Sequence, residues 1–222
     1  MSIFYIILLC FLLLNIFHDN SGYFLDNCQQ FCYSNYVIVQ IVNKFNNSDG
    51  TNLTKNKGVV DCMRFGIKTL DEFDYRGKTV ICRVDINQPV DRATGTLRST
   101  TRIRACVPTI RELSDKGAHV VLLAHQGSDI EYKNYYTLRP HCAVLEELLG
   151  RPVQFVEDVC GPAAQEAVRS LQDGEILLLE NVRYMAEEQT LFELKLKLTH
   201  EQQAQTVVVR KLAPLAALYI CD

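Results

Sequence analysis

The sequence predicts an α/β fold in which helices cover both faces of a parallel β-sheet. From Lys78 onward, short apolar runs alternate with amphipathic stretches of helical periodicity, which is the pattern of repeated strand–helix units. The apolar runs are continuous rather than alternating, as expected of strands that are buried on both faces. The roughly 145 residues of this region suffice for one hydrophobic core.

Each element is predicted from its periodicity and from the residues that bound it. Five buried strands are predicted over residues 78–84, 118–124, 153–156, 175–179 and 218–220. Four helices are predicted over about 100–116, 137–149, from 161 onward and about 201–213. Thr100 or Thr101 is expected to cap the first helix and Thr137 the second, with Gly117 and Gly150 at their ends.

The composition changes abruptly near Met63, which indicates two segments of different origin. Residues 1–62 contain no Ala, Arg, Glu or Pro but nine Asn, whereas residues 63–222 carry all of those four types and only three Asn. Residues 2–17 are nearly all apolar and suit a signal-peptide core or a short membrane segment. No Lys or Arg precedes that run and no small-residue cleavage site follows it. We therefore hypothesise that residues 1–62 are a mistranslated leader and that Met63 is the natural start.

Charge and cysteine content narrow the class of protein. With 48% hydrophobic residues, 22% charged residues and a net charge of -3, the chain is typical of a globular protein and predicts neither a nucleic-acid nor a membrane partner. Nine cysteines are present, and the five after Met63 stand singly without a CxxC pair, which disfavours zinc. We expect these five to be reduced and buried, as in a cytoplasmic protein.

Polar and basic side chains follow several predicted strands at the point where each strand ends. Because ligands of open α/β sheets bind outside the carboxyl ends of the strands, we expect these groups to meet at one edge. Arginine, histidine and asparagine together suit a small anion that carries hydroxyl, carboxylate and phosphate groups. The groups are, in chain order, Asp85, Asn87, Arg102, Arg104, His125 and Arg183.

Each of these groups alone also has a purely structural interpretation. Asp85 and Asn87 are typical turn formers, and Arg102 suits a solvated helix face. His125 suits a packed or capping position, and Arg183 suits an ion pair with a surface carboxylate. The binding interpretation therefore depends on the combination of these residues at one sheet edge.

Four stretches of the sequence together resemble the phosphoglycerate kinase family. They are VICRVDINQP at 80–89, TRIR at 101–104, VLLAHQG at 121–127 and LLENVR at 178–183, in that family's order and spacing. The resemblance covers residues 63–222, and the His-Gln-Gly run is similar to the archaeal branch. It implies a Rossmann-like domain, the N-terminal, 3-phosphoglycerate-binding half of a normally two-domain monomeric kinase of glycolysis. Mg-ADP or Mg-ATP would bind to a C-terminal domain that we expect this chain to lack.

The resemblance also implies roles for individual residues. Arg102 corresponds to the catalytic arginine, which stabilises the transferring phosphoryl group. Asp85 and Asn87 are implied to contact the hydroxyl and carboxylate side of 3-phosphoglycerate, and His125 and Arg183 its phosphate end. No metal-binding or nucleotide-binding residue is expected in this chain. The full implied substrate-binding set is Asp85, Ile86, Asn87, Arg102, His125, Gln126, Gly127, Ser128 and Arg183.

Three residues depart from the family pattern. Gln88 stands where a small residue is usual, Ser128 stands in place of an arginine, and Cys221 replaces an asparagine before Asp222. We expect Gln88 to crowd its loop and Ser128 to remove one anion contact.

The family reaction transfers a phosphoryl group from 1,3-bisphosphoglycerate to ADP and gives 3-phosphoglycerate and ATP, with two domains closing around the substrates. Because this chain resembles only one of the two domains, we expect weak 3-phosphoglycerate binding and little turnover by the chain alone. The alternative is a non-catalytic module that binds a phosphorylated metabolite without chemistry and that residues 2–17 could tether to a membrane. The product of a broken gene is a further form of this alternative.

Overall fold

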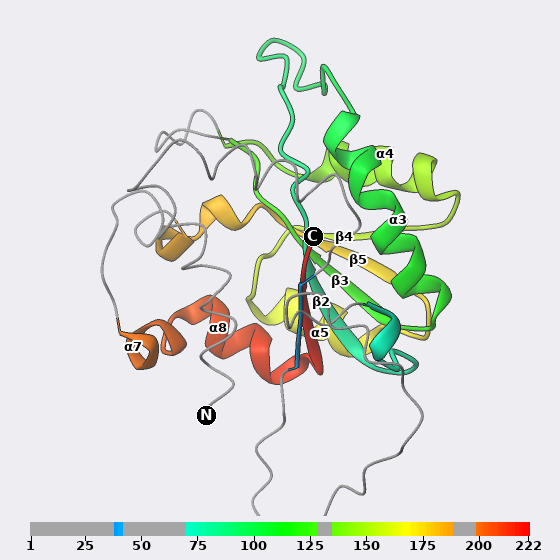
Figure 1. Cartoon of the computed structure of the whole chain (residues 1–222). Coiled ribbons are helices and arrows are strands. Elements are labelled where there is room, and N and C mark those ends of the chain that lie inside the picture. The colour runs from blue at the N-terminus through cyan, green and yellow to red at the C-terminus, as the bar shows by residue number, and fades with distance from the viewer. Residues whose placement is uncertain (1–37, 42–69, 128–134, 189–198) are drawn as a thin grey trace, which may run out of the picture.

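The computed structural model describes residues 38–41, 70–127, 135–188 and 199–222. It confirms the predicted α/β architecture, with helices on both faces of one β-sheet whose strand order is β1-β6-β2-β3-β5-β4 (Figure 1). Five of these strands run parallel to one another, as the sequence predicts. They are β2 (Thr79–Arg83), β3 (His119–Leu123), β4 (Gln154–Val156), β5 (Ile176–Leu179) and β6 (Leu218–Cys221).

Two hydrophobic cores lie on opposite faces of the sheet, because successive residues of a strand point to opposite sides. Val80 packs in the core beneath α3 and α4, whereas its neighbour Ile81 packs in the core beneath α5 and α8 (Figure 1). The α-helices are α3 (Thr101–Asp115), α4 (Arg139–Leu149), α5 (Pro162–Ser170), α7 (His200–Ala204) and α8 (Val207–Leu212). The 3-10 helices are η1 (Leu70–Glu72), η3 (Val182–Tyr184) and η4 (Ala213–Leu215).

The single helix predicted over 201–213 is wrong, since α7, α8 and η4 divide this segment. A side-chain carboxylate explains the break: Glu187 accepts hydrogen bonds from the backbone N–H of Val207 at 2.7 Å and of Val208 at 3.2 Å. These amides belong to the first turn of α8 and have no partner within the helix. A negative charge at this position also favours a helix start, so a new helix begins at Val207.

The predicted caps are correct at the ends of the helices and less accurate at their beginnings. Gly117 and Gly150 follow α3 and α4 with φ angles of +79° and +68°, a backbone conformation that favours glycine. Thr100 precedes α3, but its side chain accepts no capping hydrogen bond from the backbone of the first turn, and the residue before α4 is Leu138 rather than Thr137. The hydroxyl of Thr137 instead donates to the Glu180 carboxylate at 2.7 Å, which ties the start of α4 to the end of β5.

A sixth strand, β1 (Ile38–Ile41), comes from the segment that the sequence analysis set apart as a leader. It pairs antiparallel with β6, from Ile38 opposite Cys221 to Ile41 opposite Leu218. An otherwise parallel sheet thus gains an antiparallel edge strand, which is a common arrangement in α/β folds. The origin of residues 1–62 stays a prediction, and the apolar run at 2–17 lies outside the described residues. Among the helices that the structure does describe, none has the length and apolarity needed to cross a membrane.

Candidate functional site

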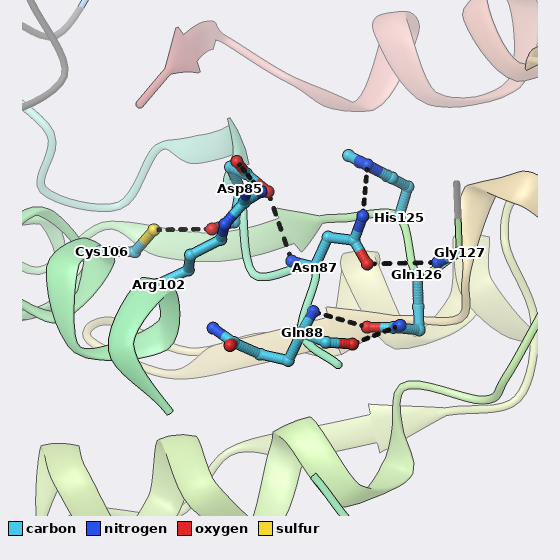
Figure 2. A network of polar contacts seen from close by, with 8 residues as sticks. All are labelled: Asp85, Asn87, Gln88, Arg102, Cys106, His125, Gln126 and Gly127. Atoms are coloured by element: carbon cyan, nitrogen blue, oxygen red, sulfur yellow. Dashed lines mark hydrogen bonds and ion pairs between the residues drawn. The ribbon is translucent and has the colours of Figure 1, made fainter. Parts of the chain in front are cut away.

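The loops after β2 and β3 bring the predicted residues together at the carboxyl edge of the sheet (Figure 2). The backbone N–H of Gly127 donates to Asn87 Oδ1 at 3.2 Å, and Asn87 Nδ2 lies 3.4 Å from His125 Nε2. The pairing of β2 with β3 explains this proximity, since the two strands are parallel and in register up to their last residues, Arg83 and Leu123. The expected convergence at one edge is therefore confirmed for these residues.

Asp85 and Arg102 form an ion pair at the exposed side of the site. Arg102 Nη1 donates to Asp85 Oδ2 at 2.7 Å, and both side chains are 54% exposed. Arg102 is the second residue of α3, so the start of this helix places its guanidinium over the β2–α3 loop. The thiol of Cys106, one turn further along α3, donates to the carbonyl of Asp85 at 3.7 Å and also holds this loop to the helix. Exposed pairs of this kind are weak, so both groups can exchange partners when a ligand arrives.

His125 lies in a positive electrostatic environment. Burial lowers the pKa of His125, and the nearby charges of Arg83 and Arg183 lower this pKa further, to about 4. The imidazole is therefore neutral at pH 7. Because Asn87 Oδ1 accepts the Gly127 N–H, Asn87 presents its Nδ2 donor to His125 Nε2, which is then the accepting nitrogen. The proton of the neutral ring then lies on Nδ1.

Arg183 reaches this environment through the loop after β5. Its backbone N–H donates to Asn181 Oδ1 at 3.0 Å at the start of η3, and its charge acts on His125. Beside it, Arg83 forms an ion pair with the buried Glu188 at 2.6 Å. Burial alone lowers the pKa of Arg83, but the carboxylate of Glu188 more than offsets this effect and holds that pKa above its ordinary value. Arg83 was expected at the end of its strand but without a binding role, and Glu188 was not expected in this region at all.

Two predicted substrate-binding residues have their side chains directed into the protein. The side chain of Ile86 is fully buried. Gln126 is 4% exposed, and its side-chain amide binds both backbone groups of Gln88, with Nε2 donating to the carbonyl at 2.8 Å and Oε1 accepting from the N–H at 2.9 Å. Direct substrate contact at these two positions stays a prediction, whereas their support of the loop is visible. Ser128 lies outside the described residues.

Asn181 joins the loops after β3 and β5, a role that the sequence analysis did not assign. Its Oδ1 accepts from the backbone N–H of Gln126 at 3.1 Å, and its Nδ2 donates to the carbonyls of Gln126 and Tyr136, both at 2.9 Å. The neighbouring Glu180 accepts from the backbone N–H of Leu138 and of Asn181 itself. The signal was present in the sequence, because a Glu-Asn pair that directly follows a run of four buried apolar residues must find partners inside the protein.

The expectations for Gln88 and for the cysteines have different outcomes. The Gln88 side chain is accommodated in a buried position, but its Nε2 has no hydrogen-bond partner among the described residues. The five cysteines after Met63 are free, and four of them are buried, as predicted, while Cys221 is partly exposed. Burial raises the pKa of the Cys142 thiol to about 11, which makes it unreactive at neutral pH.

The chemistry of the site suits an anion better than a metal ion. Hydrogen-bond donors and cations dominate it, namely Arg102, Arg183, the amide of Asn87 and the neutral ring of His125. In the part of the chain that the structure describes, no group of three or more His, Cys, Asp or Glu side chains could hold a metal ion. Arginine binds phosphate and carboxylate groups in a bidentate manner, so a small phosphorylated acid fits this set of donors.

Comparisons with known proteins agree with the motifs and the fold. The family model for phosphoglycerate kinase matches residues 70–222. Phosphoglycerate kinase of Methanothermobacter thermautotrophicus is 49% identical over 158 residues, which are 71% of this chain and 37% of that protein. The enzyme of Sulfurisphaera tokodaii is 44% identical over 156 residues, which are 70% of this chain and 36% of that protein.

A solved structure extends the likeness to three dimensions. The crystal structure of phosphoglycerate kinase from Pyrococcus horikoshii superimposes with a TM-score of 0.59 and 37% sequence identity over 66% of this chain and 34% of that one. The chain thus spans little more than a third of the length of the curated relatives it matches, with 37% and 36% of the two relatives named above. Since the family model covers well over half of the chain, this protein belongs to the phosphoglycerate kinase family.

Proposed function

We propose that the carboxyl edge of the sheet binds 3-phosphoglycerate and 1,3-bisphosphoglycerate, as the substrate-binding part of a phosphoglycerate kinase. The reaction transfers a phosphoryl group from 1,3-bisphosphoglycerate to ADP. One observation supports this proposal above the others: three separate segments meet within the region matched by the family model, where Arg102 pairs with Asp85 and Asn87 contacts His125. The backbone N–H of Asn87 joins the two pairs by donating to Asp85 Oδ1 at 3.3 Å.

Arg102 is the proposed catalytic residue. Its guanidinium is half exposed, and Asp85 is its one hydrogen-bond partner among the described residues, so it can turn to an incoming phosphoryl group with little loss of stability. Phosphoryl transfer is driven mostly by positioning and by stabilisation of charge on the transferring group, and a guanidinium supplies both. Asp85, once released, can accept a hydrogen bond from the substrate hydroxyl.

The remaining residues would hold the ends of the substrate. Asn87 has one amide hydrogen directed at His125 and its oxygen fixed by Gly127, so its orientation is set before a ligand binds. A phosphate dianion beside His125 and Arg183 would be attracted by the positive potential that lowers the histidine pKa. Binding of this dianion would in turn raise the pKa of His125 and favour its cationic form.

The nucleotide requires residues beyond this edge. By the family resemblance, Mg-ADP or Mg-ATP would bind to the C-terminal domain of a two-domain enzyme. We therefore assign to this edge only the orientation of the three-carbon substrate and the stabilisation of the transferring phosphoryl group. We further propose that the protein is cytoplasmic and monomeric and that it acts on small molecules.

The test compares two arginines of the same helix. Arg102 and Arg104 are both exposed, but Arg104 donates to Thr100 Oγ1 and does not contact Asp85. Titration of the full chain with 3-phosphoglycerate, followed by calorimetry or by NMR shifts, should show saturable binding that weakens about tenfold or more in Arg102→Gln, because a charge-assisted hydrogen bond contributes about 1.5–3 kcal/mol.

The matched variant Arg104→Gln removes the same charge and should change the affinity by less than about twofold. Absence of binding at millimolar 3-phosphoglycerate, or equal losses in the two variants, would contradict the proposal. Inorganic sulfate serves as the competitor that separates a specific site from general attraction of anions.

A further inference from the structure

A buried histidine on α4 contacts the side chain that holds the substrate loop. His141 is fully buried, and its Nε2 lies 2.9 Å from Gln126 Oε1. Gln126 in turn binds both backbone groups of Gln88, directly after Asp85, Ile86 and Asn87. The contact from α4 therefore reaches the loop of the proposed substrate site through one intermediate side chain.

The hydrogen-bond pattern determines which nitrogen of His141 carries the proton. Gln126 must direct Oε1 to the Gln88 N–H and Nε2 to the Gln88 carbonyl, because the opposite orientation would place donor against donor and acceptor against acceptor. The atom that faces His141 is thus an acceptor, so His141 Nε2 must donate. Since Oε1 accepts from both Gln88 and His141, the side-chain amide is held from two directions.

We propose that His141 is a positioning residue for the substrate: by donating to Gln126 Oε1, it fixes the amide that holds the Asp85–Asn87 loop in its binding conformation. This inference rests on the proposed function of that loop. The substrate-binding set contains no residue of α4, and the inference gives this helix a part in arranging Asp85 and Asn87.

Two further observations support a specific role rather than simple packing. A fully buried imidazole must find partners for its polar atoms, a cost that an apolar residue would avoid, and this ring contacts Gln126 Oε1 and the backbone of Ile86. Burial lowers the pKa of His141 to about 4, against a smaller opposing effect of the Ile86 backbone. The ring is therefore neutral at pH 7, with a single proton that Nε2 uses for Gln126.

The experiment separates the hydrogen bond from the volume of the side chain. His141→Gln can place an amide N–H near the position of Nε2, whereas His141→Leu fills similar space without a donor. Hydrogen exchange of the Gln88 backbone amide, measured by NMR in the absence of ligand, should accelerate about tenfold or more in His141→Leu and about twofold or less in His141→Gln. The affinity for 3-phosphoglycerate should fall about tenfold in His141→Leu and recover in His141→Gln.

Controls keep the result interpretable when a variant loses stability. His119→Leu alters the histidine at the opposite end of β3, which contacts Asp173, and should leave both measurements unchanged. In a Gln126→Met background, His141→Leu should have no further effect on affinity, since the two residues act through one contact.

The outcomes also separate this inference from the proposed function. If the wild-type chain does not bind 3-phosphoglycerate, the proposed function fails, but the exchange rate of Gln88 still reports on the loop. Unchanged exchange in His141→Leu, or equal losses of affinity in the leucine and glutamine variants, would overturn the role of His141.

Discussion

The carboxyl edge of the sheet has two layers that differ in how they are held. The inner layer, defined as Glu180, Asn181, Gln126 and His141, is buried. The first three of these side chains bind the backbone of neighbouring loops, and His141 contacts the side chain of Gln126. The outer layer, defined as Asp85, Asn87, Arg102, His125 and Arg183, is at least partly exposed and carries the charged groups. The inner layer uses its hydrogen bonds within the protein, whereas the outer layer can offer its own to a ligand.

The difference shows how buried hydrogen bonds can fix the position of a binding site while the exposed side chains stay available to a ligand. A buried polar group is costly only when it lacks a partner, so the inner layer is stable because Asn181 and Gln126 satisfy several loops at once. Exposed ion pairs contribute little, so Arg102 can leave Asp85 for a substrate. Substitutions should therefore affect stability in the inner layer and binding in the outer layer.

The largest expected effect on stability follows from Asn181→Leu. The substitution leaves the backbone N–H groups of Gln126 and Arg183 and the carbonyls of Gln126 and Tyr136 without their side-chain partner. Each buried group without a partner costs about 1–3 kcal/mol, and local relaxation recovers part of the sum. We expect the free energy of unfolding, measured by urea denaturation, to fall by about 3–5 kcal/mol.

The control for this substitution is Gln154→Leu on the edge strand β4. Gln154 is exposed and donates only to the Glu175 carboxylate at 3.2 Å, so its loss should change stability by less than about 0.5 kcal/mol. Similar losses in the two variants would remove the distinction between the layers.

The second expected effect is a pH dependence of stability that comes from His141. Its pKa is about 4 in the folded protein and about 6.5 in the unfolded chain, so the unfolded state binds the proton more readily. Stability from this group is therefore present above pH 6.5 and is lost as the pH falls towards 4. Between pH 7 and pH 5 we expect His141 to contribute a loss of about 2 kcal/mol in the free energy of unfolding. His125, whose pKa is also lowered to about 4, adds a loss in the same direction.

Comparison with a variant isolates this contribution. His141→Gln cannot titrate, so its stability should change between pH 7 and pH 5 by about 2 kcal/mol less than that of the wild type. His119→Gln retains His141 and should follow the wild-type difference in this respect. Parallel pH profiles for His141→Gln and the wild type would show that the buried ring is not the origin.

The place of the outer layer in the fold could be predicted from the sequence, whereas the place of His141 in the inner layer could not. Parallel strands end at the same edge, so residues that directly follow a strand, such as Asn87 and His125, can be placed together from strand order alone. His141 offers no comparable signal, because it lies within a helix rather than directly after a strand. Its role depends on how α4 packs against the sheet, which periodicity does not specify.

The errors in the predicted elements come from contacts that the local sequence does not specify. The strands and the glycine ends of α3 and α4 depend on local sequence and were predicted within a few residues. The division of the last helix depends on Glu187, which lies twenty residues before Val207 in the chain. The pairing of β1 with β6 joins two segments separated by about 180 residues, and no local pattern identifies such a partner.

A third, smaller effect should be stabilising. Within the part of the chain that the structure describes, the buried Gln88 Nε2 has no hydrogen-bond partner, although the backbone of the same residue is held by Gln126. Gln88→Met keeps a side chain of similar length and removes the amide, so the unsatisfied donor disappears. We expect the free energy of unfolding to rise by about 1 kcal/mol, measured by urea denaturation. Gln88→Ala, which also removes the amide but leaves a cavity, should not show this gain.

The smallest expected effect on stability is that of Arg102→Gln, although Arg102 is the proposed catalytic residue. Its pair with Asp85 is short at 2.7 Å, but both side chains are 54% exposed, so solvent screens the attraction. We expect the free energy of unfolding to change by less than about 0.5 kcal/mol, while the affinity for 3-phosphoglycerate falls about tenfold or more. A large loss of stability in this variant would place Arg102 among the residues that hold the fold, and the separation between a structural inner layer and a binding outer layer would no longer stand.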